Sequence, residues 1–192
     1  EVLRQVDIHQ GNLTELQTYS EISIAFRVES IYRIKDNGLA GIELCEEKVK
    51  NPYIKDYDTA KGEGPTRWFK RFDVSDWAIF RVFEGGRAVG GAVVTPGFRV
   101  GDLDKRFSQL FDIRVQPEKR GTGIGTLLLK NVNEYLRRQD VKYLKIETEN
   151  TNVPACKFYR QQGCTLGSIE RYAYHDYPQV EHEVRLLWYL TL

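Results

Sequence analysis

The sequence predicts an α/β protein, in the α+β sense, whose mixed and mostly antiparallel twisted sheet is flanked by helices. Segments rich in β-branched and aromatic residues alternate with Gly-containing turns up to about residue 94. A strand, a glycine-rich turn and an amphipathic helix then follow one another. A second strand-to-helix pair occupies residues 143–162. These three observations predict a mostly antiparallel first half and a β-α-β-α-β second half.

The first half is expected to consist mainly of strands. We expect, in order, a strand near Leu3–His9, a short helix near Asn12–Thr18, a long strand over 22–35, an extended segment from Gly41–Cys45, a long irregular loop over 50–66, and strands Trp77–Phe83 and Ala88–Val94. A hairpin turn, Glu84–Arg87, joins the last two strands. The second half contains a loop at 95–104, a strand at 106–115, a strand at 143–148, a helix at 152–162, and strands near 164–175 and 183–191.

Length and composition favour one domain, residues 1–192, with enough apolar residues for a sizeable core. The 28 basic and 27 acidic side chains give a net charge of +1, so nucleic acid is not an expected partner. No apolar run is long enough to span a membrane and no signal peptide is visible. Three cysteines are too few and odd in number for a disulfide framework, so we expect a cytoplasmic protein. We expect it to be a monomer or a homodimer.

The segment 112–125, DIRVQPEKRGTGIG, is the most informative part of the chain. A β-branched strand ends at Val115, and glycines lead into a helix whose apolar positions recur at helical spacing: Ile124, Leu127, Leu128, Val132, Tyr135 and Leu136. The first turn of a helix has unpaired N–H groups and a partial positive charge, and glycine lets an anion approach them. The segment therefore predicts a phosphate-binding turn.

Two familiar phosphate motifs do not fit this turn. G-x-G-x-x-G fails because the third position is Thr126 or Leu128, depending on the starting glycine, although Glu147 could imitate the ribose-binding acid. The G-K-S/T run of a P-loop is missing from the sequence. The remaining alternative is a glycine-rich turn that binds no ligand.

The spacing R-x-x-G-x-G, formed by Arg120, Gly123 and Gly125, resembles the pyrophosphate motif of the GNAT superfamily of acetyl-CoA-dependent N-acyltransferases. Residues 143–163 carry the order N-x-x-A-x-x-F-Y-x-x-x-G, which resembles the second GNAT signature. Its positions are Asn152, Ala155, Phe158, Tyr159 and Gly163. Two motifs in the right order are more specific than either one, and they make acetyl-CoA the expected cosubstrate.

Three further stretches resemble the streptothricin acetyltransferase branch of this superfamily: RWFKRFDVSDW (67–77), VPACKFY (153–159) and VRLLWYL (184–190). The core of the resemblance covers roughly residues 68–190. The first 65 residues match only loosely, through KDYD at 55–58.

The resemblance implies a role for each matching residue. The pyrophosphate would be held by the loop residues Arg120, Gly121, Thr122, Gly123, Ile124, Gly125 and Thr126. The strand residues Ile113, Arg114 and Val115 would pair with the pantetheine amides, although sequence alone indicates an ordinary core strand. The second signature, Asn152, Ala155, Phe158 and Tyr159, would line the pantetheine arm. No metal is expected.

Three side chains are candidates for the chemistry. Glu147 is the candidate base for the amine proton, Asp112 is its rival, and either carboxylate could instead only bind a cationic substrate. Tyr159 is the candidate donor to the departing sulfur, with a core tyrosine as the alternative. A covalent role for Cys156 would need an activating neighbour, and no histidine is near it in sequence.

The expected acceptor is a small cationic amine. The resemblance to the streptothricin acetyltransferase branch implies a streptothricin-type antibiotic as one such acceptor. Candidate walls and charges lie in the first half: Trp68, Phe69, Phe72 and Trp77, with Asp56, Asp58, Asp73 and Asp76. Aromatic residues at this density are more often core than pocket. The alternatives are an N-acetyltransferase for proteins or peptides and a CoA-binding sensor without catalysis.

Overall fold

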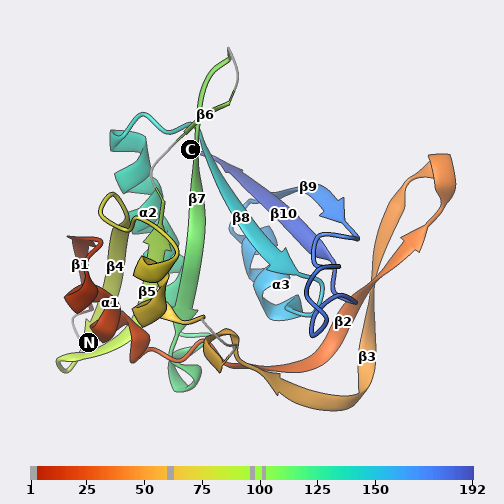
Figure 1. The fold of residues 1–192 in the computed structure, drawn as a ribbon, viewed down its shortest axis with the longest axis horizontal. Helices are drawn as coiled ribbons and strands as arrows, with labels where there is room; N and C mark the ends of the chain where they lie inside the picture. The colour runs from red at the N-terminus through yellow and green to blue at the C-terminus, as the bar shows by residue number, and fades with distance from the viewer. Residues whose placement is uncertain (1–3, 60–62, 96–97, 101–102) are drawn as a thin grey trace. The chain divides into compact units, whose positions relative to one another are not determined.

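The structure is a computed structural model that describes residues 4–59, 63–95, 98–100 and 103–192, with side chains left undescribed at 98–100 and 103–106. The chain divides into two compact units (Figure 1). Unit 1 comprises Glu1–Phe26, Asp56–Lys145 and Thr191–Leu192, and unit 2 comprises Arg27–Lys55 and Ile146–Leu190. Neither unit is one continuous segment, and one boundary falls within strand β8 (Tyr143–Glu149).

Unit 1 is built on antiparallel strands. They are β1 (Gln5–Gln10), β4 (Ala78–Glu84), β5 (Arg87–Val94), β6 (Phe98–Val100) and β7 (Leu103–Val115). Their order is β1-β4-β5-β7, and β6 pairs with β7. The β4–β5 hairpin turns through Gly85 and Gly86, which both have positive φ, as a tight hairpin turn requires.

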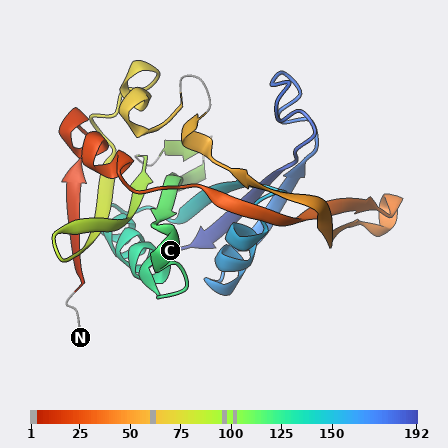
Figure 2. The ribbon, with the colours of Figure 1, turned by 90° about the horizontal axis from the view of Figure 1, so that it is seen from below.

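Helices lie on both faces of these strands (Figure 2). One face carries α1 (Leu13–Ser20) and the 3₁₀ helix η3 (Pro65–Lys70), and the other carries α2 (Ile124–Arg138). A Cβ at Gly90 would lie 2.5 Å from Ile124 Cγ2 of α2, and a Cβ at Gly91 would lie 2.4 Å from Tyr19 Cε2 of α1. Because neighbouring residues of a strand face opposite sides, these two glycines let both helices approach β5 closely.

The helix α2 packs through Ile124, Leu128, Leu129, Val132 and Leu136, which are all buried. The amphipathic pattern of the sequence is therefore confirmed for this helix, with Leu129 added and Leu127 only half-buried. Short 3₁₀ turns, η2 (Tyr57–Thr59) and η4 (Pro117–Lys119), complete unit 1.

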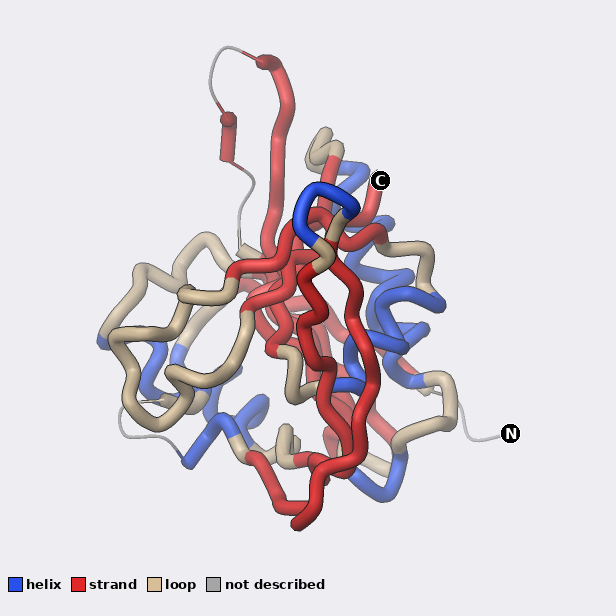
Figure 3. Tube along the Cα trace, turned by 90° about the vertical axis from the view of Figure 1, so that its right-hand side faces the viewer, coloured by secondary structure: helices blue, strands red, loops and turns tan. Residues whose placement is uncertain are grey.

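Unit 2 combines two sets of strands with one helix. The long strands β2 (Phe26–Asp36) and β3 (Ile42–Lys55) form a twisted two-stranded ribbon, closed by the 3₁₀ turn η1 (Gly38–Ala40) (Figure 3). Strand β8 neighbours β10 (Arg185–Thr191), which pairs antiparallel with β9 (Thr165–Glu170). Helix α3 (Val153–Gln161) follows β8.

The predicted α/β class, with mostly antiparallel strands and flanking helices, is confirmed. Three local predictions were wrong. Residues 50–55, expected in a loop, extend β3, because pairing with β2 outweighs Pro52 on a strand of a two-stranded ribbon. Residues 98–100, expected in a loop, form β6, and residues 171–175, expected at the end of a strand, form turns. Leu3 and residues 60–62, 96–97 and 101–102 of the predicted elements lie outside the described residues.

None of the helices among the described residues combines the length and the apolar character needed to cross a membrane.

Candidate active site

The end of β7, in unit 1, carries the strand residues expected to face the cosubstrate. Along β5, Val93 pairs with Asp112 and Val94 pairs with Leu110, so Phe111 is an extra residue in β7. This is a β-bulge, a device that increases local twist and re-aims the residues beside it. Ile113 and Val115 follow the bulge and are both half-buried.

The side chain of Arg114 is buried and fully engaged within unit 1. Its Nε and Nη2 donate to the two oxygens of Asp112, each at 2.8 Å, and its Nη1 donates to Asp58 Oδ2 at 2.7 Å and to Ile22 O at 3.0 Å. Burial opposes its charge, but attraction to Asp112 and the hydrogen bonds that it donates to both carboxylates raise the pKa of Arg114 above its usual value. Because the guanidinium is engaged in this way, a ligand at Arg114 would contact the backbone rather than the side chain.

Asp112 is engaged from two sides. It receives both hydrogen bonds from Arg114 and a third from the hydroxyl of Tyr19, and 8% of its side chain is exposed. Tyr19 is buried in the core, and that burial raises its pKa well above the usual value. These contacts describe a carboxylate that compensates a buried guanidinium, which is the usual requirement for burying such a charge.

The glycine-rich turn between β7 and α2 has the geometry of an anion site. Gly121 and Gly123 adopt φ of 74° and 87°, and α2 begins after Gly123 with no side-chain cap. A Cβ at Gly121 would meet no atom within 4 Å, and a Cβ at Gly123 would meet only Arg4 Nη1, at 3.9 Å. The glycines are thus needed for the backbone conformation and keep the space in front of the helix start open.

Basic side chains surround this turn. Arg120 is exposed and donates from Nε to Val115 O at 3.0 Å, and burial of part of its guanidinium lowers its pKa. Arg4 donates to Thr122 O at 2.8 Å, and Thr122 Oγ1 donates to Lys119 O at 2.7 Å. Glu84 pairs with Arg4 at 2.9 Å and with Lys119 at 2.5 Å. These residues hold the turn in place and leave Arg120 near its surface.

In unit 2, the second signature forms the start of α3. Asn152 caps this helix, with its Oδ1 accepting from the N–H of Ala155 at 3.2 Å, and Pro154 lies in the first turn. Phe158 is half-buried, with its ring 5.3 Å from that of Tyr159. Tyr159 is 4% exposed and lies on the buried face of α3. The helix ends before Gly163, whose φ is 87°.

Glu147 lies on β8, and its carboxylate belongs to a small polar cluster of unit 2. Strand alternation places it on the opposite face from Thr148, whose hydroxyl contacts Cys156 of α3. The hydroxyl of Tyr174 donates to Glu147 Oε1 at 2.8 Å, and Arg185 Nη1 lies 3.8 Å from Oε2. One third of the Glu147 side chain remains exposed.

The chain is similar to known acetyltransferases. The family model described as "Acetyltransferase (GNAT) family" matches residues 43–164. A protein of Escherichia coli named streptothricin acetyltransferase is 34% identical over 152 residues, which cover 78% of this chain and 76% of that protein. The chain belongs to the GNAT family of acetyltransferases, in its streptothricin acetyltransferase-like branch.

Solved structures agree with the fold. A nourseothricin acetyltransferase superposes with a TM-score of 0.74 at 24% identity, over 97% of this chain and 98% of that one. A Bacillus anthracis acetyltransferase solved with acetyl coenzyme A gives a TM-score of 0.74 at 22% identity, over 98% of both chains. Membership in the family makes this protein an acetyl-CoA-dependent N-acetyltransferase, and the open, basic turn before α2 is compatible with the cosubstrate's phosphates.

The surroundings of Cys156 decide whether its thiol could act as a nucleophile. Cys156 is 1% exposed, and its sulfur lies 3.4 Å from Thr148 Oγ1, which also accepts from Trp188 Nε1 at 3.0 Å. Burial raises the pKa of Cys156 to about 11. A thiol in this state is protonated at neutral pH, so the cysteine is a packing residue rather than a nucleophile.

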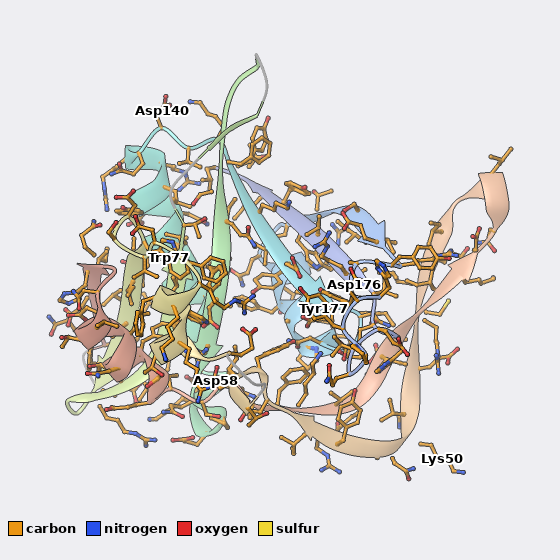
Figure 4. The ribbon with its side chains drawn as sticks, viewed as in Figure 1. Lys50, Asp58, Trp77, Asp140, Asp176 and Tyr177 are labelled. Carbon is orange, nitrogen blue, oxygen red and sulfur yellow. The ribbon has the colours of Figure 1, made fainter. Side chains whose placement is uncertain are left out.

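The residues predicted as acceptor walls lie largely in the core of unit 1. Trp68 and Trp77 are 5% and 4% exposed and pack on Phe111, with ring centroids at 5.0 Å and 4.5 Å from it. Figure 4 labels Trp77 and Asp58 within this unit. Phe69 and Phe72 remain 40% and 38% exposed. The aromatic stretch is thus mainly structural, as its density indicated.

Three of the four acidic residues predicted near the acceptor accept hydrogen bonds within the protein. Asp58 binds Arg114, Asp56 accepts from the N–H of Asp58 at 3.0 Å, and Asp73 accepts from the N–H and hydroxyl of Ser75. Asp76 is exposed. Within the described part of the chain, no group of three or more His, Cys, Asp or Glu side chains is arranged to hold a metal ion.

Proposed function

We propose that this protein transfers the acetyl group of acetyl-CoA to a primary amine of a small cationic acceptor of the streptothricin type. The observation that carries the proposal is the 34% identity to the Escherichia coli streptothricin acetyltransferase over three quarters of both chains. The residues of the two GNAT signatures are all present, which is compatible with a working enzyme.

In this proposal, unit 1 binds the cosubstrate mainly through its backbone. The N–H groups of the turn Gly121–Thr126 bind the pyrophosphate, and the dipole of α2 favours that negative charge. Arg120 adds a charge-assisted hydrogen bond from the edge of the turn. The backbone of Ile113–Val115 pairs with the amides of the pantetheine arm, next to the bulge at Phe111.

Proton removal from the acceptor is the role we propose for Glu147. A lysine-like amine has a pKa of ~10.4, so deprotonation at pH 7 accounts for about 4.6 kcal/mol of the barrier. A carboxylate that is one-third exposed and accepts a hydrogen bond from Tyr174 can take that proton directly or through water. Asp112 is the less favoured base, because Arg114 and Tyr19 already occupy its oxygens.

Departure of the thiolate is the step in which we place Tyr159. A phenol has a pKa of about 10 and a thiol a pKa of about 8.5, so full proton transfer from the phenol to the thiolate is uphill. The hydroxyl can stabilise the departing sulfur by a hydrogen bond as well as by full proton transfer. Asn152, Ala155 and Phe158 would support the pantetheine arm from the first turns of α3. Asn152 meets a structural need as well, because it caps that helix.

The two units would act as one domain of 192 residues. Unit 1 is made of three chain segments and unit 2 of two, so neither corresponds to a piece of chain that could be cut out. This interleaving supports a single acetyltransferase domain.

The proposal is tested by an acetyl-CoA thiol-release assay with the purified protein. Streptothricin, linear polyamines such as spermidine, and peptides with a free amino terminus or lysine are compared at equal concentrations. Saturable acetylation of streptothricin, at a higher kcat/KM than any peptide, is the expected result. Ready acetylation of peptides with streptothricin untouched would refute the acceptor, while leaving the family unaffected.

A further inference from the structure

The segment between β9 and β10 contains three tyrosines that differ in their surroundings. Tyr172 and Tyr177 are 79% and 58% exposed, and Figure 4 labels Tyr177 beside Asp176 in this turn-rich segment of unit 2. Tyr174 is instead half-buried, and its hydroxyl reaches β8. The GNAT signatures do not include this residue.

The contact made by Tyr174 is specific. Its hydroxyl donates to Glu147 Oε1 at 2.8 Å, across 27 residues of sequence. That oxygen is therefore engaged, whereas Oε2 lies 3.8 Å from Arg185 Nη1, which is longer than a direct hydrogen bond. The two oxygens of Glu147 thus differ: Oε1 accepts a hydrogen bond from the tyrosine, whereas Oε2 has, among the described residues, only the longer ionic contact with Arg185.

The environment of Tyr174 keeps the donor in place. Burial, together with the nearby carboxylates of Glu149 and Glu147, raises the pKa of Tyr174 well above its usual value. The hydroxyl therefore keeps its proton at any pH at which the enzyme would work. Arg185 has its close contact with another carboxylate, since its Nε donates to Glu170 Oε2 at 2.7 Å.

We infer that Tyr174 is a positioning residue, which holds Oε1 of Glu147 so that Oε2 is oriented to take the acceptor's proton. The inference rests on the proposed role of Glu147 as base. Fixing a catalytic group in one orientation removes rotational freedom that would otherwise be lost on reaching the transition state. Through Tyr174, the segment 171–184 would help to orient the proposed base.

The test is the variant Tyr174→Phe, which removes only the hydroxyl. We expect kcat to fall about tenfold to a hundredfold. The KM for acetyl-CoA and the melting temperature should stay close to those of the parent protein, because the ring and its packing are kept. The matched control is Tyr172→Phe, which loses a hydroxyl from an exposed tyrosine of the same segment and should leave kcat unchanged.

A double-mutant cycle with Glu147→Gln separates positioning from a general structural effect. If Tyr174 acts through Glu147, adding Tyr174→Phe to Glu147→Gln should change kcat by less than about twofold. An equal loss in both backgrounds would overturn the inference, since the tyrosine would then act independently of the carboxylate.

The failure of the inference and that of the proposed base give different results. If Glu147→Gln is strongly impaired while Tyr174→Phe matches the parent protein, only the positioning role is overturned. If Glu147→Gln itself keeps full kcat, the proposed base is wrong and the positioning role is overturned with it.

Discussion

The glycine turn of unit 1 and the carboxylate cluster of unit 2 are built from different parts of the chain. In the turn, the groups that we propose for ligand binding are backbone N–H groups, in a conformation for which Gly121 and Gly123 hold positive φ. In the cluster, the group that we propose for the chemistry is the side chain of Glu147, which accepts a hydrogen bond from a tyrosine distant in sequence. The first site depends on backbone conformation and the second on side-chain contacts.

This difference explains which sequence changes each site should tolerate. A backbone site is damaged by any residue that needs negative φ or that adds bulk, and only slightly by changes to side chains at its edge. A side-chain site is damaged by loss of one functional group, even when shape is preserved. Substitutions that keep the shape of a side chain therefore distinguish the two kinds of site.

The largest effect is expected from Glu147→Gln, which keeps the shape of the side chain but cannot accept a proton. We expect kcat to fall about 10²–10⁴-fold, the range of general acid–base catalysis, and the acidic limb of the kcat/KM profile to change. Steady-state kinetics across pH provide the measurement. If only the KM for the amine rises, Glu147 is a binding charge and Asp112 becomes the better candidate.

A smaller loss is expected from Tyr159→Phe. Removing the hydroxyl should lower kcat about a hundredfold, near the lower end of that range, with little change in CoA affinity. Steady-state assays of thiol release measure this change in kcat. A variant within about twofold of the parent would identify Tyr159 as a core residue, which its 4% exposure also allows.

A moderate effect is expected from Arg120→Ala at the edge of the turn. Because the side chain is exposed, its charge-assisted bond is partly screened, and we expect CoA to bind about tenfold more weakly. The loss should shrink as salt is raised. A loss as large as that caused by disrupting the glycines would show that side chains, rather than the backbone, dominate the site.

No effect on turnover is expected from Cys156→Ala. Burial keeps the thiol protonated, so kcat should stay within about twofold of the parent value. The change should instead lower the melting temperature, since it leaves a small space beside Thr148 and Trp188. Abolished activity in a folded variant would point to a covalent acetyl-cysteine.

The elements that carry strong local signals could be predicted from sequence. The helix α2, the Asn152 cap of α3 and the glycine hairpin at Gly85–Gly86 follow from periodicity, capping and turn chemistry. The strand over 50–55 could not, because Pro52 and the charges around it indicate a loop until β2 is there to pair with.

The site shows the same limit. The glycine-rich turn is local in sequence, so its residues could be proposed together as a phosphate site. The engagement of Asp112 depends on Arg114, Tyr19 and Asp58, which meet only in the fold, and no periodicity indicates it. The contact between Tyr174 and Glu147 could not be predicted for the same reason, since a tyrosine in a polar, turn-rich segment carries no signal for a partner 27 residues earlier.

The most direct test of the contrast is a calorimetric titration of CoA into two variants, Gly123→Val and Glu147→Gln. Valine at a φ of 87° is strained and places a branched side chain in front of the helix start. Gly123→Val should therefore bind CoA at least about a hundredfold more weakly, or ~2.7 kcal/mol, with circular dichroism confirming the fold. Glu147→Gln should bind CoA like the parent. Unchanged CoA binding in folded Gly123→Val, or an equal loss in both, would contradict the account.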